Sequence, residues 1–266
     1  MVELGGIFDV AFKRMKRFVA LVSCLLLSSA SLRAELLIAA ASDLRFALEE
    51  LVTKFREDHA SSAVKPIYGS SGNFYAQILN DAPFDLFLSA DAAYPRQLIA
   101  RGKGTEEELF VYAIGRLVIW VPKSSPIKVE DLGIKALLDS TAKKIAIANP
   151  EHAPYGRAAV AAMKKFGVYD KVASRLVLGE NIAQTAQFVD SGNADIGIIA
   201  YSLAIVPKMK DAGRFWEIPL DAFPRLDQAG LVLAGTKNAN AAREFRKFMQ
   251  SNRGQEVLKT YGFILP

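Results

Sequence analysis

Residues 36–55 read LLIAAASDLRFALEELVTKF, and this stretch decides the fold. Its first part, Leu36–Ala40, is a short apolar run typical of a buried strand. The following apolar residues recur at the spacing of one buried helix face; they are Leu44, Ala47, Leu48, Leu51, Val52 and Phe55. A strand therefore runs directly into a helix. At the corner between them, Ser42 is expected as the N-cap and Asp43 in the first helical turn.

The same alternation of apolar runs and amphipathic segments continues to the end of the chain. Further strands are expected at Val64–Tyr68, Leu86–Ser89, Arg116–Pro122, Lys144–Ala148, Arg175–Leu178, Ile196–Ala200 and Gly230–Ala234. Helical patterns lie between these runs, and a last amphipathic helix is expected at Ala242–Leu258. Strands that alternate with helices predict an α/β protein with largely parallel sheets.

Two segments are candidates for crossings of the chain between two lobes, namely Leu109–Gly115 and Ile218–Gly230. A chain that crosses twice builds one lobe from both of its ends and the other from its middle. We therefore expect lobe I to comprise residues 35–113 and 226–266, and lobe II to comprise residues 114–225. Ligands of α/β proteins bind outside the carboxyl ends of the strands, so a cleft between the lobes would bring two such ends together.

The N-terminal segment, residues 1–34, is interpreted as an extension with a signal peptide. Lys13–Arg17 is basic, Phe18–Leu27 is apolar, and Ser28–Ala30 offers small residues for cleavage. This order predicts export to the periplasm. The only cysteine, Cys24, lies inside the apolar run, and lipid anchoring through Cys24 is the weaker alternative.

Composition excludes several classes of protein. The chain has 266 residues, of which 51% are hydrophobic and 23% charged, a mixture typical of globular proteins. The net charge is +5, and without residues 1–34 the chain keeps 28 basic and 26 acidic residues, a net charge of +2. No basic run suits a nucleic-acid backbone, so no nucleic-acid partner is expected. The exported chain would contain no thiol, and therefore no disulfide.

Small and hydroxyl-bearing residues lie between strand and helix at four corners of the expected fold. Besides Ser42 and Asp43, these corners are Gly69–Gly72, Asn149–Gly156 and Gly179–Ile182. Each helix start exposes unpaired backbone N–H groups at the positive end of the helix dipole. Two corners fall in each expected lobe, so closure of the lobes would bring neutral donors together from both sides. This arrangement predicts a pocket for a compact anion that is held without a counter-cation.

A hydrolase or transferase on the same two-lobed fold is the alternative from a different class. Such an enzyme needs a nucleophile next to a base, and the one pair available is Ser71 with His152. The other histidine, His59, ends the first expected helix, where an imidazole suits the dipole. Two histidines without a thiol argue against a zinc site. We therefore predict a binding protein that is not an enzyme, with no cofactor and no directly ligated metal.

Taken in order, the corner motifs resemble those of the molybdate-binding periplasmic proteins of bacterial ABC transporters. The matching motifs are Ala39–Ser42, Gly69–Gly72, Asp85–Asp91, Asn149–Gly156, Gly179–Ile182 and Tyr261–Phe263. The resemblance covers nearly all of residues 35–266. It implies a two-lobed type II periplasmic-binding fold, molybdate or tungstate as the ligand, a membrane ABC permease complex as the partner, and a monomer.

The resemblance also implies which residues hold the oxyanion. Ser42 and Ser71 match the two serines of the family, and Tyr155 and Ile182 match positions whose backbone N–H points inward. Asp43 would offer only its main chain, with the carboxylate turned away. The hydroxyl of Tyr155 is a candidate for a further donor.

One position departs from the family pattern. Many members carry a ligand-binding tyrosine in the strand after the fourth helix, and the gap-free match here is Ala200, followed by Tyr201. A shift of one residue in a strand turns the side chain to the other face. Tyr201 is therefore left out of the predicted site, with Tyr155 as its candidate substitute.

The chemistry of molybdate agrees with a pocket made of donors alone. Molybdate at neutral pH is a tetrahedral dianion that can only accept hydrogen bonds. Hydrogen-phosphate also donates, and its buried O–H group would find no acceptor, a penalty of about 1–3 kcal/mol. Sulfate has the same hydrogen-bonding character as molybdate and stays the alternative ligand, because its rejection would rest on cavity size.

Overall fold

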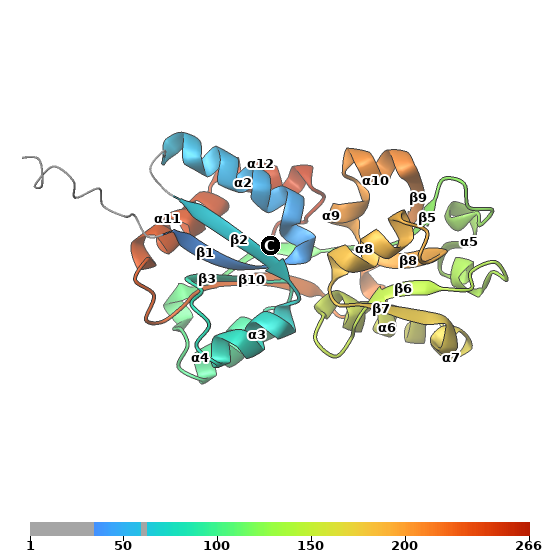
Figure 1. The fold of residues 1–266 in the computed structure, drawn as a ribbon, viewed down its shortest axis with the longest axis horizontal. Helices are drawn as coiled ribbons and strands as arrows, with labels where there is room; N and C mark the ends of the chain where they lie inside the picture. Colours follow the sequence, from blue (N-terminus) through green and yellow to red (C-terminus); the bar gives the residue numbers. More distant parts are fainter. Residues whose placement is uncertain (1–34, 60–62) are drawn as a thin grey trace, which may run out of the picture. The chain divides into compact units, whose positions relative to one another are not determined.

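The structure is a computed structural model that describes residues 35–59 and 63–266. The expected signal peptide and Cys24 lie outside the described residues. Two five-stranded sheets form the described part, with strand orders β2-β1-β3-β10-β4 and β7-β6-β8-β5-β9. Each sheet carries helices on both faces, and we call the first sheet with its helices lobe I and the second lobe II (Figure 1). The expected α/β class is confirmed, but both sheets are mixed rather than largely parallel, because β10 and β5 run antiparallel to their neighbours.

Lobe I is built around a strand that is buried on both faces. Its strands are β1 (Leu36–Ala41), β2 (Val64–Gly69), β3 (Leu86–Ser89), β4 (Leu109–Gly115) and β10 (Leu226–Val232). Strand β1 lies between β2 and β3 and runs parallel to both, whereas β10 is antiparallel to β3 and β4. Ile38 of β1 belongs to the apolar cluster on one face, and Ala39 to the cluster on the other. This double burial explains the uninterrupted apolar run in the sequence.

The helices of lobe I divide between the two faces of its sheet. They are α2 (Arg45–Asp58), α3 (Ser71–Leu79), α4 (Ala93–Ala100), α11 (Ala239–Gln250) and α12 (Asn252–Thr260). Helices α2, α11 and α12 cover the face of Ile38, while α3 and α4 cover the face of Ala39. The predicted helix face from Leu44 to Phe55 is confirmed, since its apolar residues are all buried.

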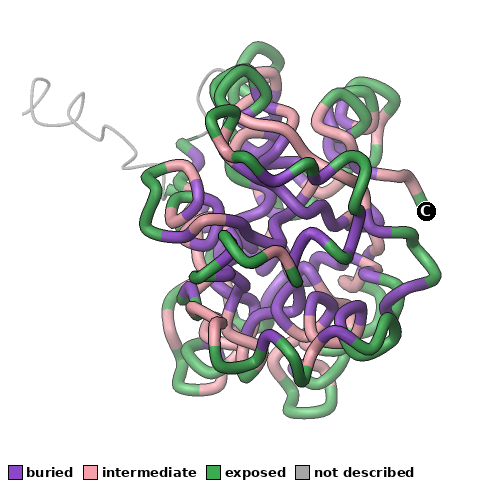
Figure 2. The backbone as a smooth tube through the Cα atoms, turned by 90° about the vertical axis from the view of Figure 1, so that its right-hand side faces the viewer, coloured by how far each residue is buried: buried purple, intermediate pink, exposed green. Residues whose placement is uncertain are grey.

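Lobe II repeats this plan with the middle of the chain. Its strands are β5 (Leu117–Pro122), β6 (Ile145–Ala148), β7 (Leu176–Gly179), β8 (Ile196–Ala200) and β9 (Gly213–Glu217). Its helices are α5 (Val129–Leu132), α6 (Pro154–Lys165), α7 (Tyr169–Val172), α8 (Ile182–Asp190), α9 (Tyr201–Ala204) and α10 (Pro207–Ala212). Helices α6 and α8 contact β6 and β8 from opposite sides of the sheet. Buried residues run through the inner segments of the chain, and exposed residues lie on the outer helices and loops (Figure 2).

The segments expected as crossings are largely strands. Leu109–Gly115 is strand β4, an edge strand of lobe I, and only Arg116 separates it from β5 of lobe II. On the return, the linker is the short stretch between β9 and β10, and β10 begins at Leu226 rather than at the expected Gly230. Strand β9 was not expected at all. The division of the chain at 113/114 and 225/226 stays a prediction.

Candidate functional site

A small cavity lies where the lobes meet, at the residues that follow β1, β2, β3, β6 and β7. It is lined by Ala41, Ser42, Asp43, Gly69, Ser70, Ser71, Ala90, Ala153, Pro154, Tyr155 and Ile182, and its volume is about 10 Å³. The structure thus brings together all the residues predicted from the sequence as ligands. Their role as ligands stays a prediction.

Backbone amides from both lobes face this cavity at helix starts. Ser71 and Ile182 are the first residues of α3 and α8, and Tyr155 is the second residue of α6. Amides in the first turn of a helix have no intrahelical acceptor. Within the described part of the chain, none of these three N–H groups donates a hydrogen bond to another residue. They are therefore free to donate to a bound anion.

The two serine hydroxyls differ in what they already bind. The Oγ of Ser71 accepts a hydrogen bond from the amide of Ala90 at 3.0 Å, which leaves its own proton free to donate. The Oγ of Ser42 reaches across to lobe II, where it donates to Oδ1 of Asn181 at 3.1 Å and accepts from the amide of Ala183 at 3.3 Å. Ser71 can therefore donate to an anion directly. The hydroxyl of Ser42 must first break its hydrogen bond to Asn181 before it can donate to an anion.

The cavity has no basic side chain. Among the residues that line it, Asp43 is the only one that can carry a charge. An anion here would be held by neutral dipoles alone, which agrees with the prediction of a pocket without a counter-cation.

The side chain of Asp43 connects the two lobes through hydrogen bonds at the cavity wall. Its Oδ2 accepts hydrogen bonds from the hydroxyl of Tyr155 at 2.9 Å and from the side-chain amide of Gln228 at 2.5 Å. Burial raises the pKa of Asp43 from its ordinary 3.8 to about 6, and the hydrogen bonds from Gln228, Tyr155 and the backbone of Asp43 and Leu44 offset only part of the increase. The hydroxyl of Tyr155 donates to Asp43, so it is not the free donor that the sequence suggested. The free donor of Tyr155 is its backbone N–H group.

The raised pKa makes Asp43 a source of pH-dependent stability. Its folded form binds more protons than its unfolded form between about pH 4 and pH 6, so its contribution is complete at low pH and is lost as the pH rises through 6. In chemical denaturation, the free energy of unfolding of the wild type should fall by about 3 kcal/mol relative to Asp43→Asn from pH 4 to pH 7. If the free energies of unfolding of the two proteins changed with pH in the same way, the raised pKa of Asp43 would be contradicted.

Further contacts hold the lobes together around the cavity. The guanidinium of Arg157, on α6, binds the carboxylate of Asp91 at 2.7 Å and the hydroxyl of Tyr94 at 2.9 Å, both in lobe I. The amide of Gly72 donates to the backbone oxygen of His152 at 2.9 Å. Both contacts lie close together, since a Cβ at Gly72 would approach both the backbone of His152 and the hydroxyl of Tyr94.

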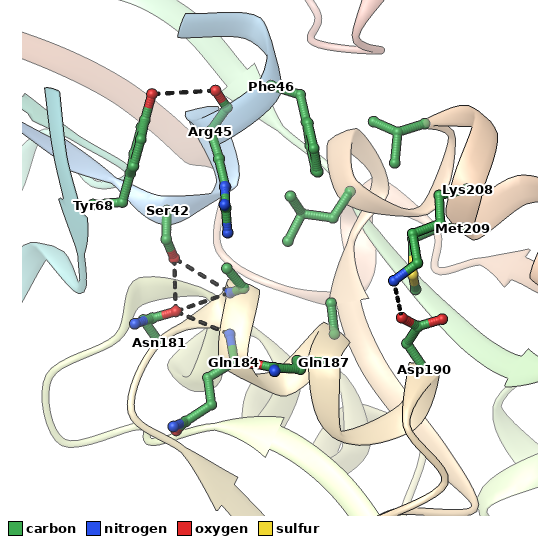
Figure 3. Close-up of a pocket in the computed structure, with 14 residues that line it drawn as sticks. Ser42, Arg45, Phe46, Tyr68, Asn181, Gln184, Gln187, Asp190, Lys208 and Met209 are labelled. Carbon is green, nitrogen blue, oxygen red and sulfur yellow. Dashed lines mark hydrogen bonds and ion pairs between the residues drawn. The ribbon is translucent and has the colours of Figure 1, made fainter. Parts of the chain in front are cut away.

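A larger groove borders the cavity at Ser42. It has a volume of about 540 Å³ and runs between the start of α2 and helices α8 to α10 (Figure 3). Its charged residues already have partners, because Lys208 binds Asp190 at 2.6 Å and Arg45 lies 3.7 Å from Glu49. The unpaired donors lie in the small cavity, so we place the site there.

The nucleophile–base pair considered above is not formed. His152 places its Nδ1 2.9 Å from the Oγ of Ser70, not of Ser71. Ser70 is the N-cap of α3, where its Oγ also accepts from the amide of Asn73 at 3.4 Å. On the other side of the ring, Glu180 lies 3.9 Å from Nε2, beyond hydrogen-bonding distance. The geometry does not support Ser71 with His152 as a catalytic pair.

Tyr201 lies outside the cavity. It starts α9, and its ring lies against the guanidinium of Arg116 at 3.9 Å. Its omission from the predicted site therefore agrees with the lining of the cavity.

The predicted helix starts are confirmed at two corners and wrong at one. Asn181 caps α8 through hydrogen bonds from the amides of Ala183 and Gln184, both at 3.0 Å, and Pro154 is the first residue of α6. Ser42, by contrast, is not an N-cap: it begins a 3-10 turn, Ser42–Leu44, and its side chain turns to lobe II.

Sequence reasoning missed Gln228 and Arg157. Gln228 is fully buried in β10, and its one sequence signal is an amide within an otherwise apolar strand. Arg157 carried no signal, because an arginine in the first turns of a helix is ordinarily solvated. Both act through contacts with the other lobe, which a linear pattern does not show.

Comparison with known proteins agrees with this geometry. A family described as bacterial extracellular solute-binding proteins matches residues 36–264. The chain belongs to this family. The chain also resembles individual proteins over almost its whole length. It is 35% identical to the molybdate-binding protein ModA of Rhodobacter capsulatus over 246 residues, which cover 92% of this chain and 94% of the relative.

Proteins of Azotobacter vinelandii are similar to this chain both in sequence and in structure. The chain is 35% identical to the ModA protein of Azotobacter vinelandii over 252 residues, 94% of this chain and 98% of the relative. It also superposes on the solved periplasmic molybdate-binding protein of Azotobacter vinelandii with a TM-score of 0.82 and 32% identity, over 87% of this chain and 100% of that one. The predicted two-lobed periplasmic-binding fold is confirmed. The relatives are solute-binding proteins, in agreement with a role in binding rather than catalysis.

Proposed function

We propose that this chain is the periplasmic substrate-binding component of a molybdate ABC transporter. It holds one molybdate ion in the small cavity through Ser42, Asp43, Ser71, Tyr155 and Ile182. The observation that carries this proposal is the set of unpaired backbone amides of α3, α6 and α8, which approach one cavity from two lobes and face no basic side chain. The molybdate-binding relatives support the same ligand.

The mechanism follows from the position of these donors. Ser71 belongs to lobe I, whereas Tyr155 and Ile182 belong to lobe II, so only a closed cleft lets all of them donate to one ion. A ligand that binds the closed state more tightly shifts the equilibrium towards it. The ion therefore closes the lobes, and the closed form is the one presented to a membrane permease complex. Asp43 contributes its main chain.

Tungstate has the same charge and nearly the same size as molybdate, so we expect it to bind as well. Sulfate offers the same acceptors but is smaller, and it would leave some of the fixed donors too far away. We further propose that residues 1–34 direct the chain to the periplasm and that the mature protein acts as a monomer.

Titration calorimetry with molybdate, tungstate, sulfate and phosphate tests the ligand. We expect molybdate and tungstate to bind with similar affinity and both to bind more tightly than sulfate and phosphate. A preference for phosphate, or no binding of any oxyanion, would overturn the proposal.

Ser71→Ala tests the site. Loss of one hydrogen bond to a charged ligand costs about 1.5–3 kcal/mol, so we expect molybdate affinity to fall by roughly 10- to 100-fold. Ser191→Ala is the control, because its hydroxyl is exposed at the other end of α8, where it donates to the backbone oxygen of Phe188 and accepts from the side chain of Asn193, far from the cavity lining. Unchanged affinity in Ser71→Ala would exclude this hydroxyl as a ligand.

A further inference from the structure

Asp43 is a buried carboxyl group in which one oxygen accepts two side-chain hydrogen bonds and the other has no partner among the described residues. Its residue is 1% exposed and lines the cavity. In the described part of the chain, its Oδ1 and the Oε1 of Gln228 are buried oxygens without a hydrogen-bond partner. A proton on the carboxyl group is the donor that this cluster lacks.

The groups that face Asp43 are all neutral. Tyr155 and Gln228 donate to Oδ2, and the hydroxyl of Ser202, on α9, donates to the backbone oxygen at 2.9 Å. Burial raises the pKa of Tyr112 of β4, and the nearby Asp43 carboxylate adds to the increase. Uncharged tyrosines and amides do not neutralise a carboxylate, so the ionised form of Asp43 has no counter-ion.

Charged side chains on the neighbouring elements have partners elsewhere. Arg45 and Glu49 of α2 are half exposed and pair with each other. Arg157 of α6 binds Asp91. His152, before α6, places its imidazole against Ser70 on the wall of the cavity. Any test must therefore separate Asp43 from His152.

We propose that Asp43 carries a proton whenever the cavity holds a fully deprotonated dianion, so that binding takes up one proton from solvent. This inference rests on the proposed function. A dianion placed in a cavity that Asp43 also lines would meet a like charge in a buried, weakly screened setting. Protonation removes that repulsion and supplies the missing donor. Asp43 is then a residue that tunes affinity and specificity rather than a passive support.

The number of protons taken up is measurable. We propose calorimetric titration of molybdate into the wild type at pH 7.5 in several buffers that differ in ionisation enthalpy. The slope of the observed binding enthalpy against the ionisation enthalpy of the buffer gives the number of protons bound per ion. The expected uptake approaches one proton for the wild type and for His152→Gln, and is near zero for Asp43→Asn. From pH 6.5 to pH 8.5, wild-type affinity should weaken by up to about tenfold per pH unit, whereas that of Asp43→Asn should stay constant.

Each outcome decides between the claims. Absence of molybdate binding at every pH would overturn the proposed function and this inference with it. Binding without proton uptake would overturn this inference alone, as would an uptake that survives Asp43→Asn and disappears in His152→Gln. If Asp43→Asn does not fold, an infrared difference spectrum of the wild type gives the answer: the carboxylic-acid C=O band must grow on binding, and its absence would contradict the proposal.

Discussion

Gly72→Val is expected to weaken molybdate binding by about 100-fold or more while both lobes stay folded. A Cβ at position 72 would lie 2.5 Å from the backbone oxygen and 2.9 Å from the Cα of His152, in the opposite lobe. Such distances are far inside van der Waals contact, and a backbone cannot move aside as a flexible side chain can. The lobes would be held apart by the added side chain. Because the proposed donors come from both lobes, an open cleft presents only half of them to the ion.

Asn73→Ala is the matched control for this prediction. It removes the contact between the Asn73 side chain and Glu180 of lobe II but adds no atoms to the interface. We expect its effect on affinity to be no more than about tenfold, since both partners are exposed. Calorimetry measures the affinities, and small-angle scattering with and without molybdate reports closure. If Gly72→Val bound as tightly as the wild type, closure of the cleft would not be required for binding.

Gly156→Ala is expected to damage both stability and binding. A Cβ here would lie 2.1 Å from the backbone oxygen of Ala148, at the end of β6. Helix α6 starts immediately before this point, so relief of the clash must move the first turn that carries the amide of Tyr155. We expect a loss of about 3 kcal/mol in the free energy of unfolding, measured by denaturation, together with a clear loss of molybdate affinity.

Gly167→Ala provides the comparison at the other end of the same helix. Gly167 follows α6 with φ of +65°, and no atom lies within 4 Å of an added Cβ. The substitution should cost about 1 kcal/mol for the left-handed backbone and leave affinity unchanged. Equal effects of the two substitutions on binding would show that the close approach of α6 to β6 does not position the site.

The corners of the site could be predicted from the sequence because each is a local feature. A strand, a small or hydroxyl-bearing residue and the start of an amphipathic helix all lie within one short stretch, as in residues 36–55. Local patterns of this kind place Ser71, Tyr155 and Ile182 at helix starts, and the structure has them there. The N-cap role of Ser42 was wrong because its hydroxyl has a better partner in lobe II, at Ala183 and Asn181.

Strand membership was harder to predict than strand formation. Strands β4 and β5 are separated by Arg116 alone, yet β4 pairs with β10 in one sheet and β5 pairs with β8 and β9 in the other. Nothing in two adjacent apolar runs says that they belong to different sheets, since pairing depends on partners far away in the chain. Strand β9, a half-buried edge strand, was missed for the same reason, because its formation depends on pairing with a distant strand.

By itself, the sequence determined the α/β class and the helix starts at Pro154 and Asn181, and it predicted an anion site at the corners, because backbone propensity and helix dipoles act over a few residues. Only the tertiary structure decided that Asp43, Tyr155 and Gln228 form one buried cluster, that Arg157 reaches Asp91, and that His152 contacts Ser70. Those contacts join residues separated by 66 to 185 positions. They exist because two lobes press together, and burial between the lobes is what gives Asp43 its unusual proton affinity.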